Sequence, residues 1–176
     1  MKKSKIQTKK LVFSALMVAV CVVIGWICKS YFTFGTIRVT FDNFPLMLVG
    51  ILLGPVWGAV VGIASDLVSC LMSGFAVNPI ITLGAASIGF VSGVVSRYII
   101  KGRKFPSVLA IALLSHSVGS MVIKSVGLWM IYRTPFYAVI LPRIPLYIVI
   151  ALVESYLIYV ILKYKPLNNM FKNGEK

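Results

Sequence analysis

The 176-residue sequence contains few charged residues, and acidic residues are the scarcest of them. Charged side chains make up 12% of the chain and hydrophobic ones 59%, and only 4 residues are Asp or Glu. Because a soluble domain has about 25% charged residues, this composition argues against a soluble globular protein. Long uncharged runs dominate instead, and they lie at 11–28, 44–65, 67–96, 105–123 and 144–153.

Several motifs of known chemistry are also absent. No Gly-x-x-x-x-Gly-Lys-Ser/Thr segment occurs, so we expect no ATP hydrolysis of the P-loop type. Neither Gly-x-Ser-x-Gly nor His-Glu-x-x-His occurs, and the adjacent residues Ser115 and His116 cannot pair along a helix, which argues against an intramembrane hydrolase. We therefore expect a protein that is not an enzyme and has no catalytic residue, metal or cofactor. The three cysteines are odd in number and lie in apolar sequence, which predicts membrane or core positions for Cys21, Cys28 and Cys70.

The positive charge is abundant but unevenly distributed. The 18 Lys and Arg residues give a net charge of +14, and most of them gather in groups that flank hydrophobic runs. Such groups are typical of the cytoplasmic loops of membrane proteins, where they set the orientation. We therefore expect a lipid bilayer, and no nucleic acid, as a partner. The groups lie at 2–10, 97–104 and 163–176.

The run lengths and the cation groups together predict an all-α integral membrane protein with six transmembrane helices. A membrane-spanning helix needs about 20 mostly apolar residues. The N-terminus and the loop at 97–104 should share the cytoplasmic side, so three crossings must fit between 44 and 96, with breaks near Gly54-Pro55 and Gly74–Pro79. Both termini are then cytoplasmic. The single domain covers 1–176, with spans expected at about 11–29, 40–54, 56–75, 79–99, 106–131 and 141–163.

The second expected span is too short to cross a bilayer by itself. The run from 44 to 53 covers only about 15 Å at 1.5 Å per residue. It must recruit residues from 37–43, tilt, or begin deep inside the protein. Irregular backbone at membrane depth is tolerated where it lines a cavity, so a short helix beside Asp42 and Asn43 indicates a pocket on the outer side.

Motifs between 36 and 67 resemble those of a known family. They include Ile37-Arg38, Phe41-Asp42-Asn43-Phe44-Pro45, Leu-Leu-Gly-Pro-Val-Trp-Gly-Ala at 52–59, and Asp66-Leu67. With the length and hydropathy of the whole chain, they resemble the S component, the substrate-binding membrane subunit, of an energy-coupling-factor (ECF) vitamin transporter. Within this family the pattern is most similar to the folate-specific branch.

The resemblance implies a fold, a function and partners. It implies an S-component-like bundle in the bacterial plasma membrane that captures folate on the extracellular side. Delivery would require a coupling transmembrane subunit and two ATP-binding subunits, which would hydrolyse the ATP. Because riboflavin-specific relatives share part of the pattern, the alternative is an S component for riboflavin, pantothenate or a similar vitamin.

A stand-alone secondary transporter is a further alternative. It would need a credible internal repeat or ion-coupling carboxylates, and only Asp66 and Glu154 lie deep in expected spans. His116 and Glu154 lie near the middles of the fifth and sixth spans, where they could form a proton relay or a structural pair between helices. The resemblance favours the structural pair, because transport in this family is driven by the ATPases of partner subunits.

Five cations lie outside the cytoplasmic groups, and all five map to the expected outer half. A cup of positive charge there would capture an anionic substrate, and Arg binds carboxylates through two parallel hydrogen bonds. Ordinary anchoring at the membrane interface is the alternative for each. Since folate carries two carboxylates, we assign Arg38, Lys124 and Arg143 to substrate binding. The remaining two cations are Lys29 and Arg133.

Four further residues complete the expected substrate site. Asp66 could accept two N–H bonds from the amino-pyrimidinone edge of a pterin, or it could pair with His116 or an outer cation. Asn78 could donate to and accept from a ligand, or merely cap the following helix. Trp129 and Tyr147 could stack on a flat ring, although interfacial belts account for most such aromatics.

Small residues recur at four-residue spacing on several expected helices. This spacing lets helix backbones approach closely, either within one bundle or against another membrane protein. In the family that the chain resembles, such a pair on the first helix docks against the coupling subunit, so Ala15 and Ala19 are the expected docking residues. Internal packing and docking are both open for the other ladders, which are Gly50, Gly54, Gly58, Gly62 and Gly89, Gly93.

Overall fold

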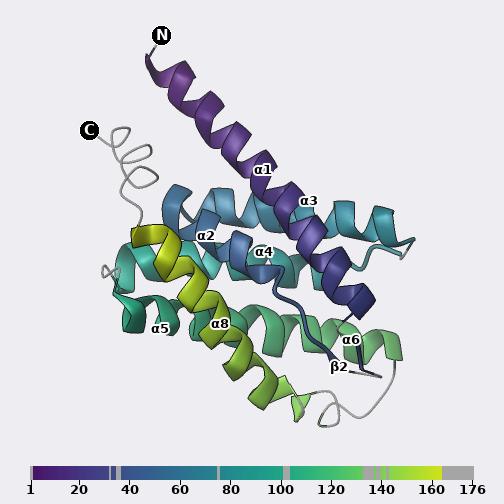
Figure 1. Cartoon of the computed structure of the whole chain (residues 1–176). Helices are drawn as coiled ribbons and strands as arrows, with labels where there is room; N and C mark the ends of the chain where they lie inside the picture. Colours follow the sequence, from purple (N-terminus) through teal and green to yellow (C-terminus); the bar gives the residue numbers. More distant parts are fainter. Residues whose placement is uncertain are drawn as a thin grey trace.

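The computed structural model describes residues 2–31, 33–34, 37–74, 76–100, 104–132, 137, 140–141 and 143–163. Within this part of the chain, the helical segments join into six continuous helices, so the all-helical prediction is confirmed (Figure 1). The helices are α1 (Lys2–Tyr31), α2 (Asn43–Leu53), α3 (Pro55–Ser73), α4 (Pro79–Val94) with the π-helical η1 (Val95–Ile99), α5 (Phe105–Ser115) with the π-helical η2 (His116–Ile123) and α6 (Lys124–Tyr132), and α8 (Arg143–Lys163).

A small antiparallel pairing, not predicted from the sequence, follows α1. Strands β1 (Thr33–Phe34) and β2 (Ile37–Arg38) pair with Thr33 opposite Arg38 and Phe34 opposite Ile37. The pairing is too short to give a hydropathy signal of its own, because each strand has only two residues. It leads into the loop that reaches α2.

Five of the described helices are long and apolar enough to cross a membrane. They occupy Ile6–Tyr31, Pro55–Ser73, Pro79–Ile99, Phe105–Met130 and Arg143–Lys163, whereas α2 has only 11 residues. Large apolar side chains point outward on these helices, among them Trp26, Leu71 and Tyr98. An outward apolar surface is what a lipid environment requires, since it replaces the polar shell of a soluble protein.

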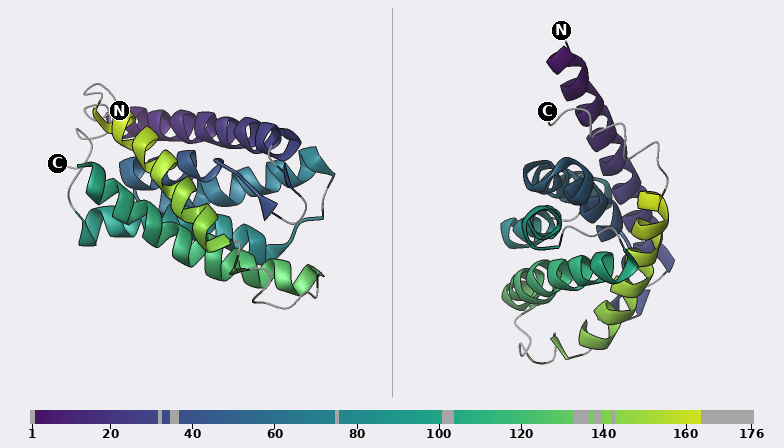
Figure 2. Two further views of the ribbon diagram at one scale, coloured as in Figure 1. Left: turned by 60° about the horizontal axis from the view of Figure 1, so that its bottom comes forward. Right: turned by 90° about the vertical axis from the view of Figure 1, so that its left-hand side faces the viewer.

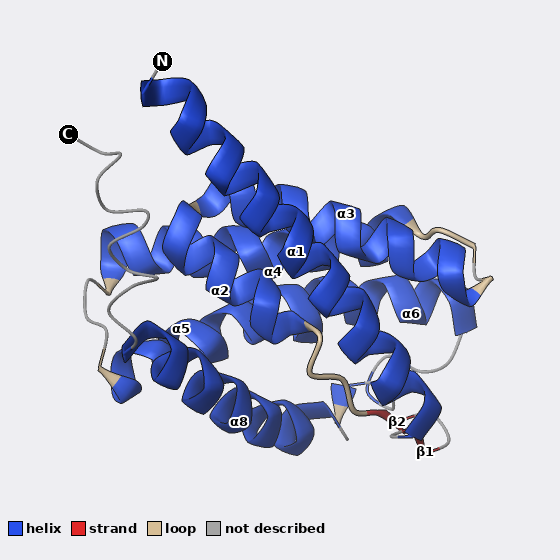
Figure 3. Ribbon diagram, turned by 45° about the horizontal axis from the view of Figure 1, so that its top comes forward, coloured by secondary structure: helices blue, strands red, loops and turns tan. Residues whose placement is uncertain are grey.

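The short helix α2 lies inside the bundle. It contacts α1, α3, α4 and α8, and nine of its 11 residues are buried, including Met47 and Val49. In Figure 3 the loop that joins β2 to α2 passes between α1 and α8. The N-terminal residue of α2, Asn43, is only 1% exposed. The second helix therefore begins inside the protein, directly after its N-cap residue Asp42.

Helix α4 lies at the centre of the arrangement. It contacts α2 and α3 on one side and α5, η2 and α6 on the other (Figure 2). Helix α1 crosses α3 and α2, while α8 packs against α5, α2 and η2. This order brings the N-terminus of α2, the middle of η2 and the middle of α8 together, although they are far apart in sequence.

Glycines allow α2, α3 and α4 to pack backbone against backbone. A Cβ atom added to Gly58 would overlap the carbonyl oxygen of Gly89, and one added to Gly89 would overlap that of Gly58. Gly50 faces Gly89 in the same way, and Gly62 faces Ala85. These four glycines therefore serve internal packing, which is one of the two roles left open by their spacing.

Two glycines with positive φ end α2 and α3. Gly54 joins α2 to α3 with φ 103°, and Gly74 ends α3 with φ 67°. Glycine adopts these values without the steric cost that a Cβ atom brings. Pro55 and Pro79 occupy the first turns of the next helices, where a missing N–H costs nothing. The helices thus end at the breaks that the sequence marks.

Candidate functional site

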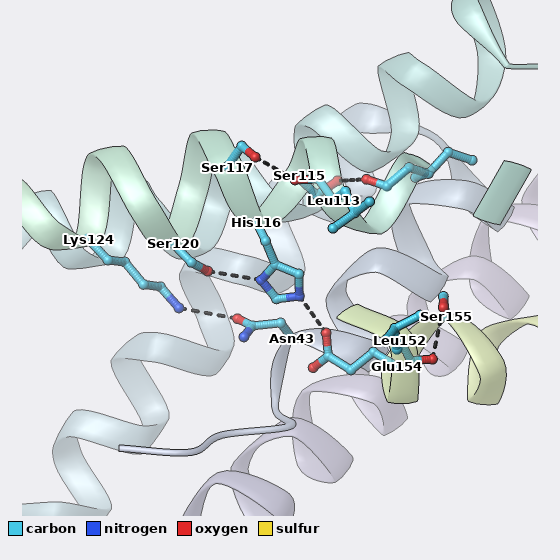
Figure 4. Close-up of polar contacts among 11 residues, drawn as sticks. Asn43, Leu113, Ser115, His116, Ser117, Ser120, Lys124, Leu152, Glu154 and Ser155 are labelled. Atoms are coloured by element: carbon cyan, nitrogen blue, oxygen red, sulfur yellow. Dashed lines mark hydrogen bonds and ion pairs between the residues drawn. The ribbon is translucent and has the colours of Figure 1, made fainter. Parts of the chain in front are cut away.

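A group of polar side chains lies inside the bundle where α2, η2, α6 and α8 meet (Figure 4). We call it the buried polar cluster, and it consists of Asn43, His116, Ser120, Lys124 and Glu154. Lys124 is half-buried, and each of the others is at most 1% exposed. Polar groups at this depth cost several kcal/mol unless they have partners, so they frequently mark a functional site.

His116 and Glu154 form the centre of the cluster. Nε2 of His116 lies 2.6 Å from Oε2 of Glu154, and Nδ1 lies 3.2 Å from the Ser120 hydroxyl. The Tyr147 ring lies against the imidazole, with centroids 5.2 Å apart and planes inclined by 35°. His116 and Glu154 are thus a hydrogen-bonded pair between two helices, the interpretation that the family resemblance favours over a proton relay.

Lys124 fixes the orientation of the Asn43 side chain. Its Nζ atom donates to Oδ1 of Asn43 at 3.2 Å. A lysine ammonium group can only donate, so the amide must turn its oxygen towards Lys124 and its nitrogen away. Asn43 therefore turns its amide nitrogen, a buried hydrogen-bond donor without a partner in the described part of the chain, away from Lys124.

In the residues that the structure describes, two of the four buried polar atoms without a partner belong to this cluster, and a third belongs to the residue that precedes Asn43. Among the described residues, four buried side-chain atoms make no hydrogen bond, and they are Ser14 Oγ, Asp42 Oδ1, Asn43 Nδ2 and Glu154 Oε1. The last two belong to the cluster, and Asp42 directly precedes Asn43. Because buried polar groups in proteins almost always have partners, this concentration is typical of a ligand site.

Two of the three cations assigned to substrate binding approach the same turn of α6. Lys124 begins α6, and Nη1 of Arg143 donates to the hydroxyl of Ser125 at 3.0 Å. Ser125 is fully buried, while both cations are half-buried. The turn therefore concentrates positive charge beside the buried polar cluster.

Two of the predicted polar residues have local partners on α3 and α4. Oδ2 of Asp66 accepts from the Thr82 hydroxyl at 2.6 Å, whereas the sequence had suggested His116 or a cation as its protein partner. Oδ1 of Asn78 accepts from the backbone N–H groups of Ile80 at 2.9 Å and Ile81 at 3.4 Å. Asn78 is thus the N-cap of α4, which was the alternative to a ligand contact.

The remaining predicted site residues differ in their surroundings. Tyr147 is only 7% exposed and lies in the cluster against His116, while Trp129 on α6 is 45% exposed. The backbone of Arg38 belongs to β2, but its side chain lies outside what the structure describes. Arg133 also lies outside the described residues.

The expected docking residues lie on the outer side of α1. Ala15 and Ala19 are exposed and line an apolar groove of about 530 Å³ between α1 and α3. Because they do not pack against the rest of the bundle, their spacing is not explained by internal packing. The other residues of the groove are Val18, Val22, Val23, Trp26, Val68 and Met72.

Sequence reasoning did not assign Asn43 or Glu154 to the substrate site. For Asn43 a signal existed, because the residue precedes a run too short to span a bilayer. For Glu154 the only signal was its depth in an apolar run. The distance between Asn43 and Glu154 depends on how α2 packs against α8, and no residue spacing along the chain specifies that packing.

Comparison with known proteins identifies the family. Residues 9–162 match the family described as "ECF transporter, substrate-specific component". No curated protein sequence matches the chain. The family match covers all the elements that form the buried polar cluster and the groove.

Several solved structures share the fold. "Crystal structure of FolT bound with folic acid" has a TM-score of 0.72 and 22% identity, covering 92% of this chain and 97% of that chain. The S component for biotin from an ECF-type ABC transporter has a TM-score of 0.69 and 17% identity, covering 94% and 97%. The S component of a bacterial ECF transporter has a TM-score of 0.54 and 21% identity, covering 94% of this chain and 99% of that chain. The chain belongs to the family of substrate-specific components of ECF transporters, which are multi-pass membrane proteins of the plasma membrane that bind a substrate and are not enzymes.

Proposed function

We propose that this S component binds folate or a closely related vitamin on the extracellular side of the membrane. The observation that carries the proposal is the approach of Lys124 and Arg143 to one turn of α6, directly beside the buried polar cluster. The turn offers positive charge for an acidic substrate, and the cluster offers hydrogen-bonding groups for a heteroaromatic ring. The fold it shares with a protein solved with folic acid supports the same substrate class.

The acidic end of the substrate is assigned to the cations. Arg143 is the main contact, because a guanidinium group can hold a carboxylate through two parallel hydrogen bonds. Lys124 adds positive charge beside it, and Arg38 adds a third cation from the outer loop. These charges also raise the local concentration of an anionic vitamin at the entrance.

The ring end of the substrate is assigned to polar and aromatic groups. Thr82 occupies one oxygen of Asp66, so a ring contact from Asp66 would use its other oxygen. Asn78 keeps its amide nitrogen as a donor while its oxygen caps α4. Tyr147 and Trp129 offer aromatic surface for stacking.

We assign the groove that contains Ala15 and Ala19 to a coupling subunit. Small exposed residues four apart allow a partner helix to approach the backbone of α1 closely. The groove is apolar, as expected for contact with another membrane-embedded helix. In this proposal two ATP-binding subunits join the coupling subunit and hydrolyse ATP, because the chain has no P-loop of its own.

A second candidate substrate is biotin. The S component for biotin has a TM-score of 0.69 against this chain, close to the value of 0.72 for the folate-bound protein. Biotin also carries a carboxylate, so the cations would suit it. What distinguishes the two vitamins is the ring, which the groups around Asn43 and Glu154 would have to recognise.

The substrate assignment is tested on the purified protein. Its absorbance spectrum should reveal a copurified pterin, and calorimetric titration should give tighter binding for folate than for biotin, riboflavin or pantothenate. Tighter binding of any of the others would contradict the folate assignment. Vitamin uptake by cells with and without the ATPase module separates an S component that depends on partners from a stand-alone transporter, which would take up the vitamin equally well in both.

A further inference from the structure

The buried polar cluster has a defined hydrogen-bond polarity. Lys124 holds Oδ1 of Asn43, so Nδ2 is a donor that faces away from the cation. Glu154 holds His116 through Oε2 at 2.6 Å. Whichever of these two atoms carries the shared proton, the remaining Oε1 of Glu154 is an acceptor. The unpartnered atoms Nδ2 and Oε1 are therefore one donor and one acceptor, and their identities are fixed by the neighbours of each side chain.

Asp42 adds a second acceptor. It directly precedes Asn43, and its Oδ1 atom is buried without a partner among the described residues. Its other oxygen, Oδ2, lies towards α1, where a Cβ atom added to Gly25 would be 3.5 Å away. In the view of Figure 4 the Asn43 amide, turned towards Lys124, and the Glu154 carboxylate, which contacts His116, both lie below the His116 ring.

We infer that Asn43 and Glu154, together with Asp42, recognise a ring edge that offers two N–H donors beside one acceptor. This inference deepens the proposed function and rests on it for the identity of the ring. A 2-amino-4-oxopyrimidine, the edge of a pterin, has such a pattern, with donors at the 2-amino group and N3 and an acceptor at O4. The cyclic urea of biotin also offers two N–H donors and one acceptor, although its carbonyl lies between the two donors. The edge of riboflavin has the opposite polarity, a single N–H between two carbonyls.

In this arrangement Lys124 is a positioning residue for Asn43, and His116 is one for Glu154. Each forms a hydrogen bond with one polar atom of its neighbour, and this bond determines whether the neighbour's other polar atom is a donor or an acceptor. Glu154 and Asp42 then contact the N–H donors of the amino-pyrimidinone edge. Asp66, which Thr82 on α4 holds through one oxygen, is left with a contact elsewhere on the ring through its other oxygen.

The test exchanges a hydrogen-bond acceptor for a donor. In Glu154→Gln the amide oxygen can stay on His116 and the amide nitrogen then faces the ligand. Binding of a pterin and of its 2,4-dioxo analogue, in which a carbonyl replaces the 2-amino group, is measured by calorimetric titration. We expect wild-type protein to prefer the pterin, and Glu154→Gln to reduce that preference by roughly tenfold to a hundredfold or to reverse it. An unchanged ratio of the two affinities would overturn the assignment of Glu154.

A second variant tests the donor independently. Asn43→Asp keeps an oxygen for Lys124 but replaces the donor with an acceptor, so relative to wild type it should shift binding towards the 2,4-diamino analogue, which carries an amino group in place of O4. This analogue also lacks the hydrogen on N3, but that loss is the same for both proteins and cancels when they are compared. A general loss of folding would lower the affinities for all analogues together and could not create this new preference. No shift towards the diamino analogue in a folded Asn43→Asp protein would contradict the role of Asn43.

The control and the choice of ligands separate the two proposals. Ser117→Ala changes the residue beside His116, but its hydroxyl is exposed and bonds to the Leu113 carbonyl of its own helix, so all ratios should stay constant. Wild-type protein that binds biotin and no pterin would contradict the folate proposal. If Glu154→Gln then weakens biotin by roughly tenfold to a hundredfold, the assignment of Glu154 as an acceptor for a ring N–H group is still supported. If wild-type protein binds only riboflavin, the inferred polarity fails as well.

Discussion

Replacement of Arg143 by alanine gives the sharpest test of the anionic end of the site. Nη1 of Arg143 donates to the buried hydroxyl of Ser125 at 3.0 Å, so the guanidinium group is held beside the first turn of α6. The variant removes the cation but leaves Lys124 and the hydrogen bond to Asn43 in place. We therefore expect the change to act on the carboxylate end of a bound vitamin and to spare its ring end.

The magnitude follows from the strength of charged hydrogen bonds. Each contributes about 1.5–3 kcal/mol, which corresponds to roughly tenfold to a hundredfold in affinity. Arg143→Ala should weaken folate by this factor and leave a pterin without the glutamate nearly unchanged. Calorimetric titration of both ligands into both proteins measures the two ratios. Arg143→Lys keeps the charge but loses the planar fork, so its effect should be intermediate.

The comparison of two ligands removes the effect of general instability, since a damaged fold would lower both affinities. Lys104→Ala is the matched control, because Lys104 is an exposed cation at the start of α5, and both affinities should stay at their wild-type values. Equal losses for folate and for the pterin in Arg143→Ala would refute the assignment of this residue to the carboxylate end.

Three further predictions concern docking, packing and topology. Ala15→Trp should fill the groove on α1 and block assembly with the coupling subunit in a pull-down while leaving ligand binding intact; loss of both would indicate an internal packing role instead. Gly89→Ala should destabilise the protein by about 1–3 kcal/mol in a thermal unfolding assay, because the added Cβ atom overlaps the backbone of α3. The control is Gly25→Ala, whose added Cβ atom has its nearest contact at 3.5 Å and should not destabilise the protein. Equal unfolding temperatures for the two variants would contradict the packing argument. Cysteine placed at position 102 should be labelled only from the cytoplasm and cysteine at 135 only from outside, and labelling of both from one face would exclude the six-span topology.

The sequence was sufficient for the fold because the fold depends on long apolar runs. Run length, cation groups and the breaks at Gly54 and Gly74 are properties of neighbouring residues, and they delimit helices directly. The strands β1 and β2 were not predicted, because a pairing of two residues leaves no periodic pattern. The buried start of α2 was one of three alternatives that the sequence left open, since a run of ten residues cannot cross a bilayer by itself.

The candidate site was less accessible to sequence reasoning, because its contacts join distant helices. Lys124 and Arg143 were selected as cations outside the cytoplasmic groups, and Tyr147 as an aromatic residue close to Arg143 in the sequence. The structure brings all three to the region of the cluster. Asp66 looked equally suitable, yet its hydrogen bond is to Thr82. Depth in a run indicates that a polar residue needs a partner, but only the packing of helices determines which partner it has.

The backbone contacts among α2, α3 and α4 also limit how this protein can open. Where glycine meets glycine there are no side chains that could change rotamer to absorb a displacement, so these helices should move as a single rigid body. Their relative motion would separate whole backbone surfaces at once. A path for a vitamin to Asn43 should therefore form by displacement of α1 or α8, which meet the rigid body through ordinary side chains. If α1 is the helix that moves, the gate of the binding site is adjacent to the groove assigned to the coupling subunit, and docking on α1 would act directly on release of the substrate.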